Sequence, residues 1–143
     1  MGIPVSLWNI GYASMSCRLL LADDHELVRK NLREIIEFKT DCVIVCEAID
    51  GLQAVQLAKE FAPDIALVDI SMPGLDGLDA ARQIRRESPL TKILILTMHD
   101  AAPIIAKIQQ TGVHGYLLKS EAPKGLALAI DWLLHDQSFF GAP

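Results

Sequence analysis

Five short apolar runs recur along the chain, and a segment with helical periodicity follows each of them. Runs of this length with few charges are typical of strands that are buried on both faces of a parallel sheet. The predicted strands are residues 17–22, 43–48, 65–69, 93–96 and 114–118. The predicted helices are residues 26–38, 51–61, 78–87, 103–111 and 123–135. This alternation predicts an α/β fold, a doubly wound five-stranded parallel sheet with helices on both faces.

The segment from Ile65 to Gly77 combines a buried strand with a candidate functional residue. Its apolar run ends at a single carboxylate, Asp69, and a loop with Pro73 and Gly74 follows at once. Open α/β sheets bind their ligands at the carboxyl ends of their strands, which is where Asp69 is expected. Taken alone, a helix cap or a solvated loop carboxylate is the more ordinary interpretation of this residue.

Polar side chains with related chemistry follow the other predicted strands. Asp23 and Asp24 end the first strand, Thr97 the fourth and Lys119 the fifth. The carboxyl ends of parallel strands share one edge, so we expect these side chains to gather around Asp69. Crowded carboxylates repel one another unless a cation joins them, and an all-oxygen ligand set suits Mg²⁺ before Ca²⁺ or Zn²⁺. Each residue alone fits a cap, a strand end or a solvated side chain, but their coincidence on one edge favours a site.

A magnesium ion held by carboxylates suits phosphoryl transfer. Asp69 can act as the nucleophile and form an acyl phosphate, while Lys119 and Thr97 supply a charge and a hydrogen bond to the phosphoryl oxygens. Nucleotide-binding folds are disfavoured because Asp-Asp-His-Glu follows the first strand instead of a glycine-rich turn. A haloacid-dehalogenase-like phosphatase is disfavoured because Ser71 stands where that class has a second Asp.

Composition narrows the interpretation further. A chain of 143 residues with 51% hydrophobic residues is long enough for one domain with its own core. A net charge of −5 argues against this chain binding nucleic-acid phosphates by itself. No apolar stretch approaches the roughly 20 residues of a membrane span, so no membrane association is expected. The odd cysteine number, without a C-x-x-C pair, indicates reduced thiols and a cytoplasmic location.

Four motifs carry a resemblance to a known family. They are Leu-Ala-Asp-Asp-His at 21–25, Val-Asp-Ile-Ser-Met-Pro-Gly-Leu-Asp-Gly at 68–77, Leu-Thr-Met-His-Asp at 96–100 and Gly-Tyr-Leu-Leu-Lys at 115–119. Over residues 17–138 the chain resembles a bacterial response-regulator receiver domain. The residues within these motifs are similar to those of the NarL/FixJ (LuxR-type) branch, whose receivers precede a helix-turn-helix DNA-binding domain. The resemblance implies a flavodoxin-like sheet with strand order 2-1-3-4-5.

The resemblance also implies a role for each residue that matches a family motif. Asp69 matches the phosphoacceptor and Lys119 the conformational lysine. Asp24 matches the direct Mg²⁺ ligand and Asp23 its water-mediated partner, and the main-chain carbonyl of Ser71 completes the protein ligands. The implied cofactor is therefore Mg²⁺.

The family's switch residues are matched as well. Thr97 matches the switch hydroxyl and Tyr116 the aromatic that rotates on activation, while Ser71 and His99 are candidates for tuning the lifetime of the phosphoryl group. Metal ligation by His25 or His99 is conceivable, but surface or capping roles are the preferred interpretation. Ser120 follows the lysine where many receivers have Pro, and the isomer of that peptide bond is left open.

The implied function is phosphorylation by a sensor histidine kinase, not metabolic catalysis. Phosphorylation would shift the surface of the fourth helix, fifth strand and fifth helix, control a helix-turn-helix output, and promote a homodimer. The alternative is a stand-alone or relay receiver that acts by protein–protein contacts without DNA binding. We expect residues 1–16 to be a flexible N-terminal extension, 17–138 the receiver, and 139–143 the start of a linker to an output domain outside this chain.

Overall fold

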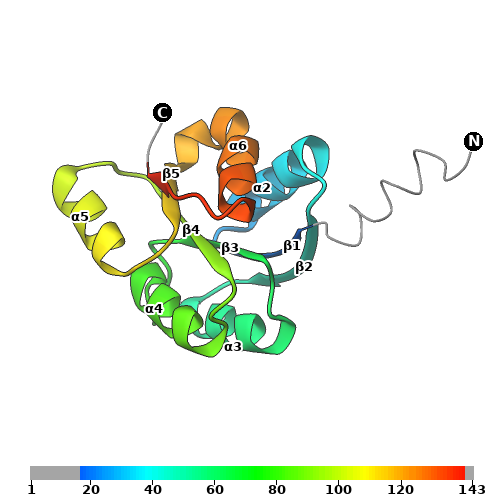
Figure 1. Ribbon diagram of the computed structural model, residues 1–143. Coiled ribbons are helices and arrows are strands. Elements are labelled where there is room, and N and C mark those ends of the chain that lie inside the picture. The colour runs from blue at the N-terminus through cyan, green and yellow to red at the C-terminus, as the bar shows by residue number, and fades with distance from the viewer. Residues whose placement is uncertain (1–16, 141–143) are drawn as a thin grey trace, which may run out of the picture.

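The computed structural model describes residues 17–140 and contains one parallel sheet with helices on both faces (Figure 1). The sheet has six strands in the order β2-β1-β3-β4-β5-β6. The strands are β1 (Arg18–Ala22), β2 (Val43–Ala48), β3 (Ile65–Asp69), β4 (Lys92–Thr97), β5 (Gly115–Leu118) and β6 (Phe139–Phe140). The predicted flavodoxin-like order is confirmed, but the predicted count of five strands is wrong. The predicted extension 1–16 lies outside the described residues.

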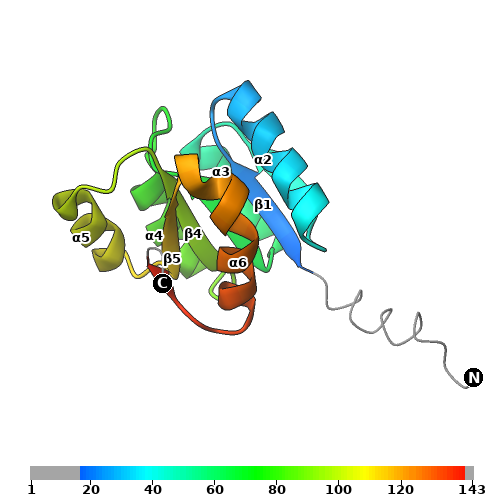
Figure 2. The ribbon, with the colours of Figure 1, turned by 90° about the horizontal axis from the view of Figure 1, so that it is seen from above.

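Two layers of helices cover the sheet. The helices are α2 (Glu26–Lys39), α3 (Gly51–Phe61), α4 (Gly77–Glu87), α5 (Ala102–Gln110), the 3₁₀ turn η1 (Lys119–Glu121) and α6 (Ala122–Leu134). Figures 1 and 2 show α2 and α6 together on one face and α3, α4 and α5 on the other. The element types agree with the alternation of periods in the sequence, since each apolar run is a strand and each amphipathic segment a helix.

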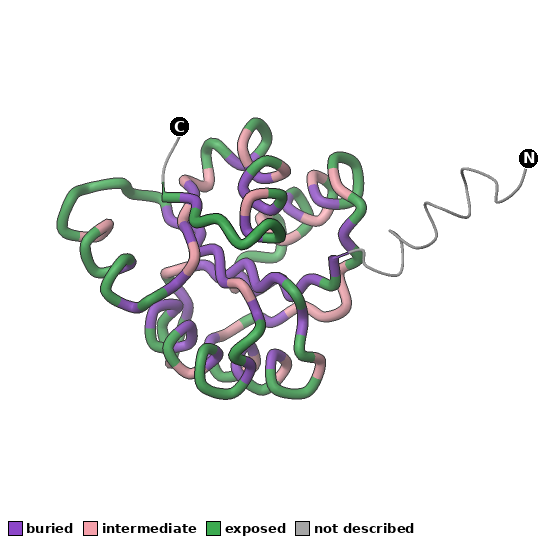
Figure 3. The backbone as a smooth tube through the Cα atoms, viewed as in Figure 1, coloured by how far each residue is buried: buried purple, intermediate pink, exposed green. Residues whose placement is uncertain are grey.

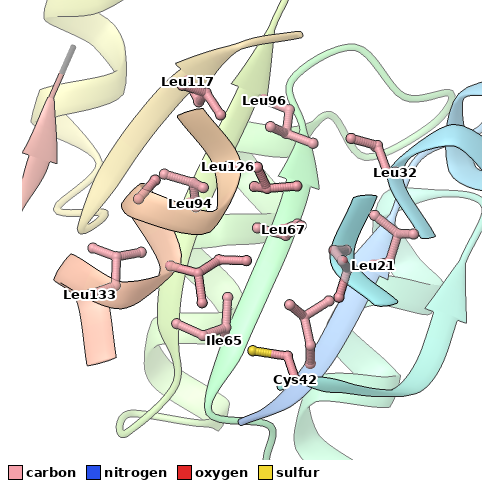
Figure 4. Packing of buried hydrophobic residues seen from close by; sticks show 14 of the residues in the cluster. Leu21, Leu32, Cys42, Ile65, Leu67, Leu94, Leu96, Leu117, Leu126 and Leu133 are labelled. Carbon is pink, nitrogen blue, oxygen red and sulfur yellow. The ribbon is translucent and has the colours of Figure 1, made fainter. Parts of the chain in front are cut away.

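The core is split by the sheet into two apolar clusters, and the strands lie between them. All five residues of β3 are buried, as expected for a central strand covered on both faces (Figure 3). On the face of α2 and α6, leucines of neighbouring strands, including Leu67 and Leu94, lie opposite Leu32 of α2 and Leu126 of α6 (Figure 4). A rigid sheet of this kind fixes the positions at which the strands end.

The loop after β3 closes tightly against the strand that it leaves. The side chain of Asp76 caps α4 by accepting a hydrogen bond from the amide of Asp79 at 2.9 Å. The amide of Gly77 donates to the carbonyl of Ile70 at 3.0 Å. A Cβ atom at position 77 would lie 2.1 Å from the carbonyl oxygen of Asp69, which no real contact permits. Glycine at this position therefore holds the start of α4 against the end of β3.

The sixth strand comes from the segment that was expected to begin a linker. After α6 the chain turns at Asp136, which has a φ of 61°, and runs back beside β5. Phe139 is buried, and its amide donates to the carbonyl of His114 at 2.9 Å. A pairing of two residues shows no periodicity in the sequence, so only the tertiary contacts reveal it.

Two further points concern residues 17–140. No peptide bond in this range is cis, so the bond between Lys119 and Ser120, which the sequence left open, is trans. This bond lies in η1, the 3₁₀ turn that connects β5 to α6. No helix within the described range is long and apolar enough to cross a membrane.

The close approach at Gly77 generates a stability prediction. The substitution Gly77→Ala should lower the free energy of unfolding by about 1–3 kcal/mol, because the methyl group must push the loop away from Asp69. The matched control is Gly125→Ala in α6, where the new Cβ would meet only the flexible end of Leu117 at 3.1 Å. That variant should stay within about 1 kcal/mol of wild type. Urea unfolding of both variants measures the difference, and equal stabilities would contradict the role of Gly77.

Candidate functional site

The strand ends bring the predicted polar residues together at one edge of the sheet. Asp23 follows β1, Asp69 is the last residue of β3, and Lys119 follows β5. The side chains of Asp23 and Asp69 are 0% and 1% exposed, whereas Asp24 is partly exposed at 28%. Two carboxylates are thus buried beside each other, and a third lies at the rim.

Lys119 compensates the two buried carboxylates. Its Nζ atom lies 2.8 Å from Asp23 Oδ2 and 3.1 Å from Asp69 Oδ2. Burial alone would lower the pKa of Lys119, but the two carboxylates outweigh burial, and the net pKa is raised. Burial raises the pKa of Asp69, the negative charge of Asp23 raises it further, and Lys119 opposes both effects only in part. The lysine therefore stays charged, and Asp69 holds its proton more firmly than an ordinary aspartate.

The donor set at this edge fits a hard divalent cation. One oxygen or nitrogen each of Asp23, Asp24, His25 and Asp69 lie within 4.8 Å of one another. Asp23 Oδ2, Asp24 Oδ1 and Asp69 Oδ2 are buried, and none of them accepts a well-directed hydrogen bond. Mg²⁺ prefers oxygen ligands, is commonly held by one or two carboxylates and keeps several waters, so this cluster offers enough carboxylate oxygens for it. The residues therefore fit the predicted metal.

Backbone amides hold the other carboxylate oxygens in place. The amide of His25 donates to Asp23 Oδ1 at 2.9 Å, and the amide of Ser71 donates to Asp69 Oδ1 at 3.2 Å. The Ser71 side chain is exposed, and its residue lies at the opening of the loop between β3 and α4. These bonds leave the remaining oxygen of each carboxylate directed at Lys119.

His25 lies closer to the carboxylates than the sequence analysis expected. Its Nδ1 atom is 3.1 Å from Asp24 Oδ1 and 3.5 Å from Asp23 Oδ1, and it carries charge only if protonated. It occupies the N-cap position of α2, but its side chain makes no capping hydrogen bond. The capping role that was one of its preferred interpretations is therefore absent. Its position directly after two aspartates was the available signal.

Arg29 and Glu47 form a support for Asp23 that sequence reasoning missed. The Arg29 side chain donates to the carbonyl of Asp23 at 2.9 Å and pairs with Glu47 at 3.3 Å. Arg33 binds the same carboxylate, with 2.8 Å between Nε and Glu47 Oε2. The pKa of Glu47 is lowered, mainly because its carboxylate accepts hydrogen bonds from Arg33. Glu47 lies on β2, so its contact with α2 has no signature in the local sequence.

Thr97 lies at the end of β4 but does not contact the carboxylates. Its hydroxyl donates to the carbonyl of His99 at 3.0 Å and accepts from the amide of His99 at 3.1 Å. Thr97 is buried, while His99 is exposed. The hydroxyl is therefore engaged by its own loop in this conformation.

Tyr116 lies on β5, outside the acidic cluster. It is half-buried and packs against the apolar cluster that includes Ile95 of β4 and Ile108 of α5. Its ring centroid is 6.3 Å from that of Phe140, with 42° between the ring planes. The structure thus assembles Asp23, Asp24, Asp69 and Lys119 in one site and leaves Thr97, His99 and Tyr116 beside it.

Comparison with known proteins gives one family. The "Response regulator receiver domain" family matches residues 19–131. The response regulator UvrY of Escherichia coli K12 is 41% identical over 124 residues, which are 87% of this chain and 57% of UvrY. The chain thus spans little more than half the length of this relative.

Solved structures agree with the sequence comparison. A LuxR-family two-component response regulator from Aurantimonas sp. SI85-9A1 superposes with a TM-score of 0.82 at 36% identity, covering 87% of this chain and 89% of that one. The receiver domain of NarL from Mycobacterium tuberculosis gives a TM-score of 0.81 at 31% identity, covering 85% and 98%. With the acidic edge of the sheet and these similarities together, the chain belongs to the response-regulator receiver domain family, in its NarL/LuxR-type branch.

Proposed function

We propose that this chain is the phosphoacceptor receiver of a cytoplasmic two-component response regulator and that Asp69 takes the phosphoryl group from a sensor histidine kinase. Receiver domains are signalling proteins and not metabolic enzymes, and the catalysis proposed here is limited to self-phosphorylation and dephosphorylation. The observation that carries the proposal is the buried Asp69 carboxylate, which has Lys119 3.1 Å from Oδ2 and no well-directed hydrogen bond at that atom.

The chemistry follows from the positions of these side chains. An oxygen of the Asp69 carboxylate forms a bond to phosphorus as the bond from phosphorus to the donor nitrogen breaks, giving an acyl phosphate. Lys119 holds a positive charge against the phosphoryl oxygens. Asp23, Asp24, Asp69 and the main-chain carbonyl of Ser71 would hold Mg²⁺, which neutralises phosphoryl charge when bound.

The signal would leave the site through Thr97 and Tyr116. A phosphoryl group adds roughly −1.5 to −2 charges and three strong acceptors, which attract the Thr97 hydroxyl. Thr97 must then give up its two hydrogen bonds to His99. Its movement frees space into which Tyr116 turns, and the surface formed by α5, β5 and α6 changes. This is a population shift between two packings of the same chain.

The proposed output is transcriptional control through a C-terminal helix-turn-helix domain, with DNA bound only by that domain and a homodimer promoted by phosphorylation. The support is that relatives of the LuxR family are two-component regulators and that the chain spans 57% of UvrY. A relay receiver that acts by protein–protein contacts is the alternative. A mobility-shift assay with the full-length protein and its own promoter DNA, before and after phosphorylation, separates the two.

Direct phosphorylation tests the central proposal. With Mg²⁺ and acetyl phosphate, intact-mass spectrometry should detect one added phosphoryl group, and peptide mapping should locate it at Asp69. Asp69→Asn should abolish the adduct, and Lys119→Ala should slow its formation roughly 10²-fold because a cation at the phosphoryl oxygens is lost. Asp131→Asn, an exposed carboxylate on α6, is the matched control and should behave as wild type. A stable adduct on Asp69→Asn would refute the assignment.

The raised pKa of Asp69 predicts a pH-dependent stability in metal-free buffer. Because the folded protein binds this proton more tightly than the unfolded chain, the stability contribution is complete below the ordinary Asp pKa of about 3.9 and is lost as the pH rises through the folded value. Asn cannot ionise, so Asp69→Asn should avoid this loss. Its melting temperature should match wild type near about pH 4 and exceed it at about pH 7 by roughly 3 °C, equivalent to ~1 kcal/mol.

The same experiment has a clear opposite outcome. If attraction to Lys119 outweighed burial and the charge of Asp23, Asp69→Asn would melt below wild type at neutral pH. Asp131→Asn, exposed in α6, should show no difference from wild type across the same pH range. Both curves come from thermal unfolding followed by circular dichroism in EDTA.

We further propose that Ser71 and His99 tune the lifetime of the acyl phosphate. The supporting observation is that both flank the site in loops, Ser71 through its bond to Asp69 and His99 through its bonds to Thr97. His99→Ala should therefore change the decay rate of phosphorylated Asp69 by a few-fold while leaving the melting temperature unchanged, since His99 is exposed. Decay is followed by intact mass after removal of acetyl phosphate, and an unchanged rate would remove His99 from this role.

A further inference from the structure

The C-terminal strand β6 pairs with the strand that carries Tyr116. The pairing is parallel, with Gly115 opposite Phe139 and Tyr116 opposite Phe140 (the red arrow beside β5 in Figure 1). In addition to this pairing, the amide of Phe139 donates a hydrogen bond to the carbonyl of His114 at 2.9 Å, just before β5 begins. A strand of two residues is therefore the outermost element next to the proposed switch residue.

Phe139 is the anchor of this strand. It is 3% exposed, and its ring meets the ring of Trp132 edge-on, with 5.5 Å between centroids and 90° between planes. The close approach of the two backbones depends on Gly115, because a Cβ there would lie 2.3 Å from the carbonyl oxygen of Phe139. The strand β6 can therefore lie this close to β5 only because position 115 is a glycine.

Phe140 is the residue that reaches the switch. The centroid of its ring lies 6.3 Å from that of Tyr116. Phe140 itself is 37% exposed to solvent. Tyr116 also packs against the apolar cluster on the α3, α4 and α5 face of the sheet, as do Ile104 and Ile105 of α5. Any rotation of Tyr116 toward the space beside Thr97 must therefore separate its ring from that of Phe140.

We propose that β6 is a releasable strand that holds Tyr116 in the position seen here, and that docking of β6 and phosphorylation of Asp69 oppose each other. This inference rests on the proposed function, because it requires that Tyr116 turns inward when Asp69 is phosphorylated. Thermodynamic linkage makes the effect reciprocal, so phosphorylation releases β6 and release of β6 favours phosphorylation. Residues after Phe140 follow directly from β6, so its release moves the point from which any following segment starts.

The competing interpretation is that β6 merely covers the edge of the sheet. Proteins often cover edge strands to prevent unwanted pairing, and such a cover has no reason to respond to the phosphorylation state. The ladder between β5 and β6 is only two residue pairs long, the shortest in the described sheet, and Phe140 at its end is 37% exposed, which favours release instead. The two interpretations differ in whether the Phe139 amide changes on activation.

Hydrogen exchange of the 143-residue chain tests the proposal directly, with Mg²⁺ and beryllofluoride used as the phosphoryl analogue. The Phe139 amide, bonded to His114, should exchange about 10-fold faster or more once the analogue binds, while amides next to Asp69 become protected. Protection next to Asp69 with unchanged exchange at Phe139 overturns the strand-release proposal and leaves the proposed function standing. No change at either position overturns both.

A pair of phenylalanine variants tests the reciprocal effect. Phe140→Ala removes the contact that restrains Tyr116 and should bind beryllofluoride about 2- to 10-fold more tightly, the range expected for one aromatic pair. Phe38→Ala is the matched control, because Phe38 is 92% exposed on α2, and its affinity should equal that of wild type. Calorimetric titration measures both. Equal affinities for Phe140→Ala and wild type overturn the proposal, and Phe140→Tyr should restore the wild-type value.

Discussion

The burial of two neighbouring carboxylates, Asp23 and Asp69, at the edge of an apolar sheet is the constraint on which the rest of the structure depends. Buried charges of the same sign cost several kcal/mol unless donors and counter-charges meet them. Here the amides of His25 and Ser71 bind one oxygen of each carboxylate, and Lys119 approaches the other oxygens. One cation against two anions leaves a net negative charge at this edge of the sheet, which suits the binding of a divalent cation such as the proposed Mg²⁺.

The fold supplies these groups without any special local geometry. Parallel strands end on one edge, so β1, β3 and β5 deliver carboxylates and lysine to the same place although they are far apart in the sequence. The loops that follow β1 and β3 need only to be held close to the strand ends. Gly77 does this after β3 by allowing α4 to start against the carbonyl of Asp69. Arg29 and Glu47 do it after β1 by fixing the backbone of Asp23.

The proposed switch residues, Thr97 and Tyr116, make contacts outside the acidic cluster in the conformation described here. The Thr97 hydroxyl is hydrogen-bonded to its own loop, and the Tyr116 ring lies 6.3 Å from that of Phe140. In the proposed mechanism, these contacts must change before a phosphoryl group at Asp69 can alter the surface of α5, β5 and α6.

The sequence by itself determined the five main strands, the helices, the strand order through the family resemblance, and the identity of Asp23, Asp24, Asp69 and Lys119. Apolar runs, helical periodicity and polar residues at strand ends are local signals, so they can be recognised in the sequence without coordinates. Only the tertiary structure decided the sixth strand, the approach of His25, the support from Glu47 and the bonds between Thr97 and His99. These depend on contacts that leave no period in the sequence, because each joins one or two residues across a fold whose geometry the whole chain sets.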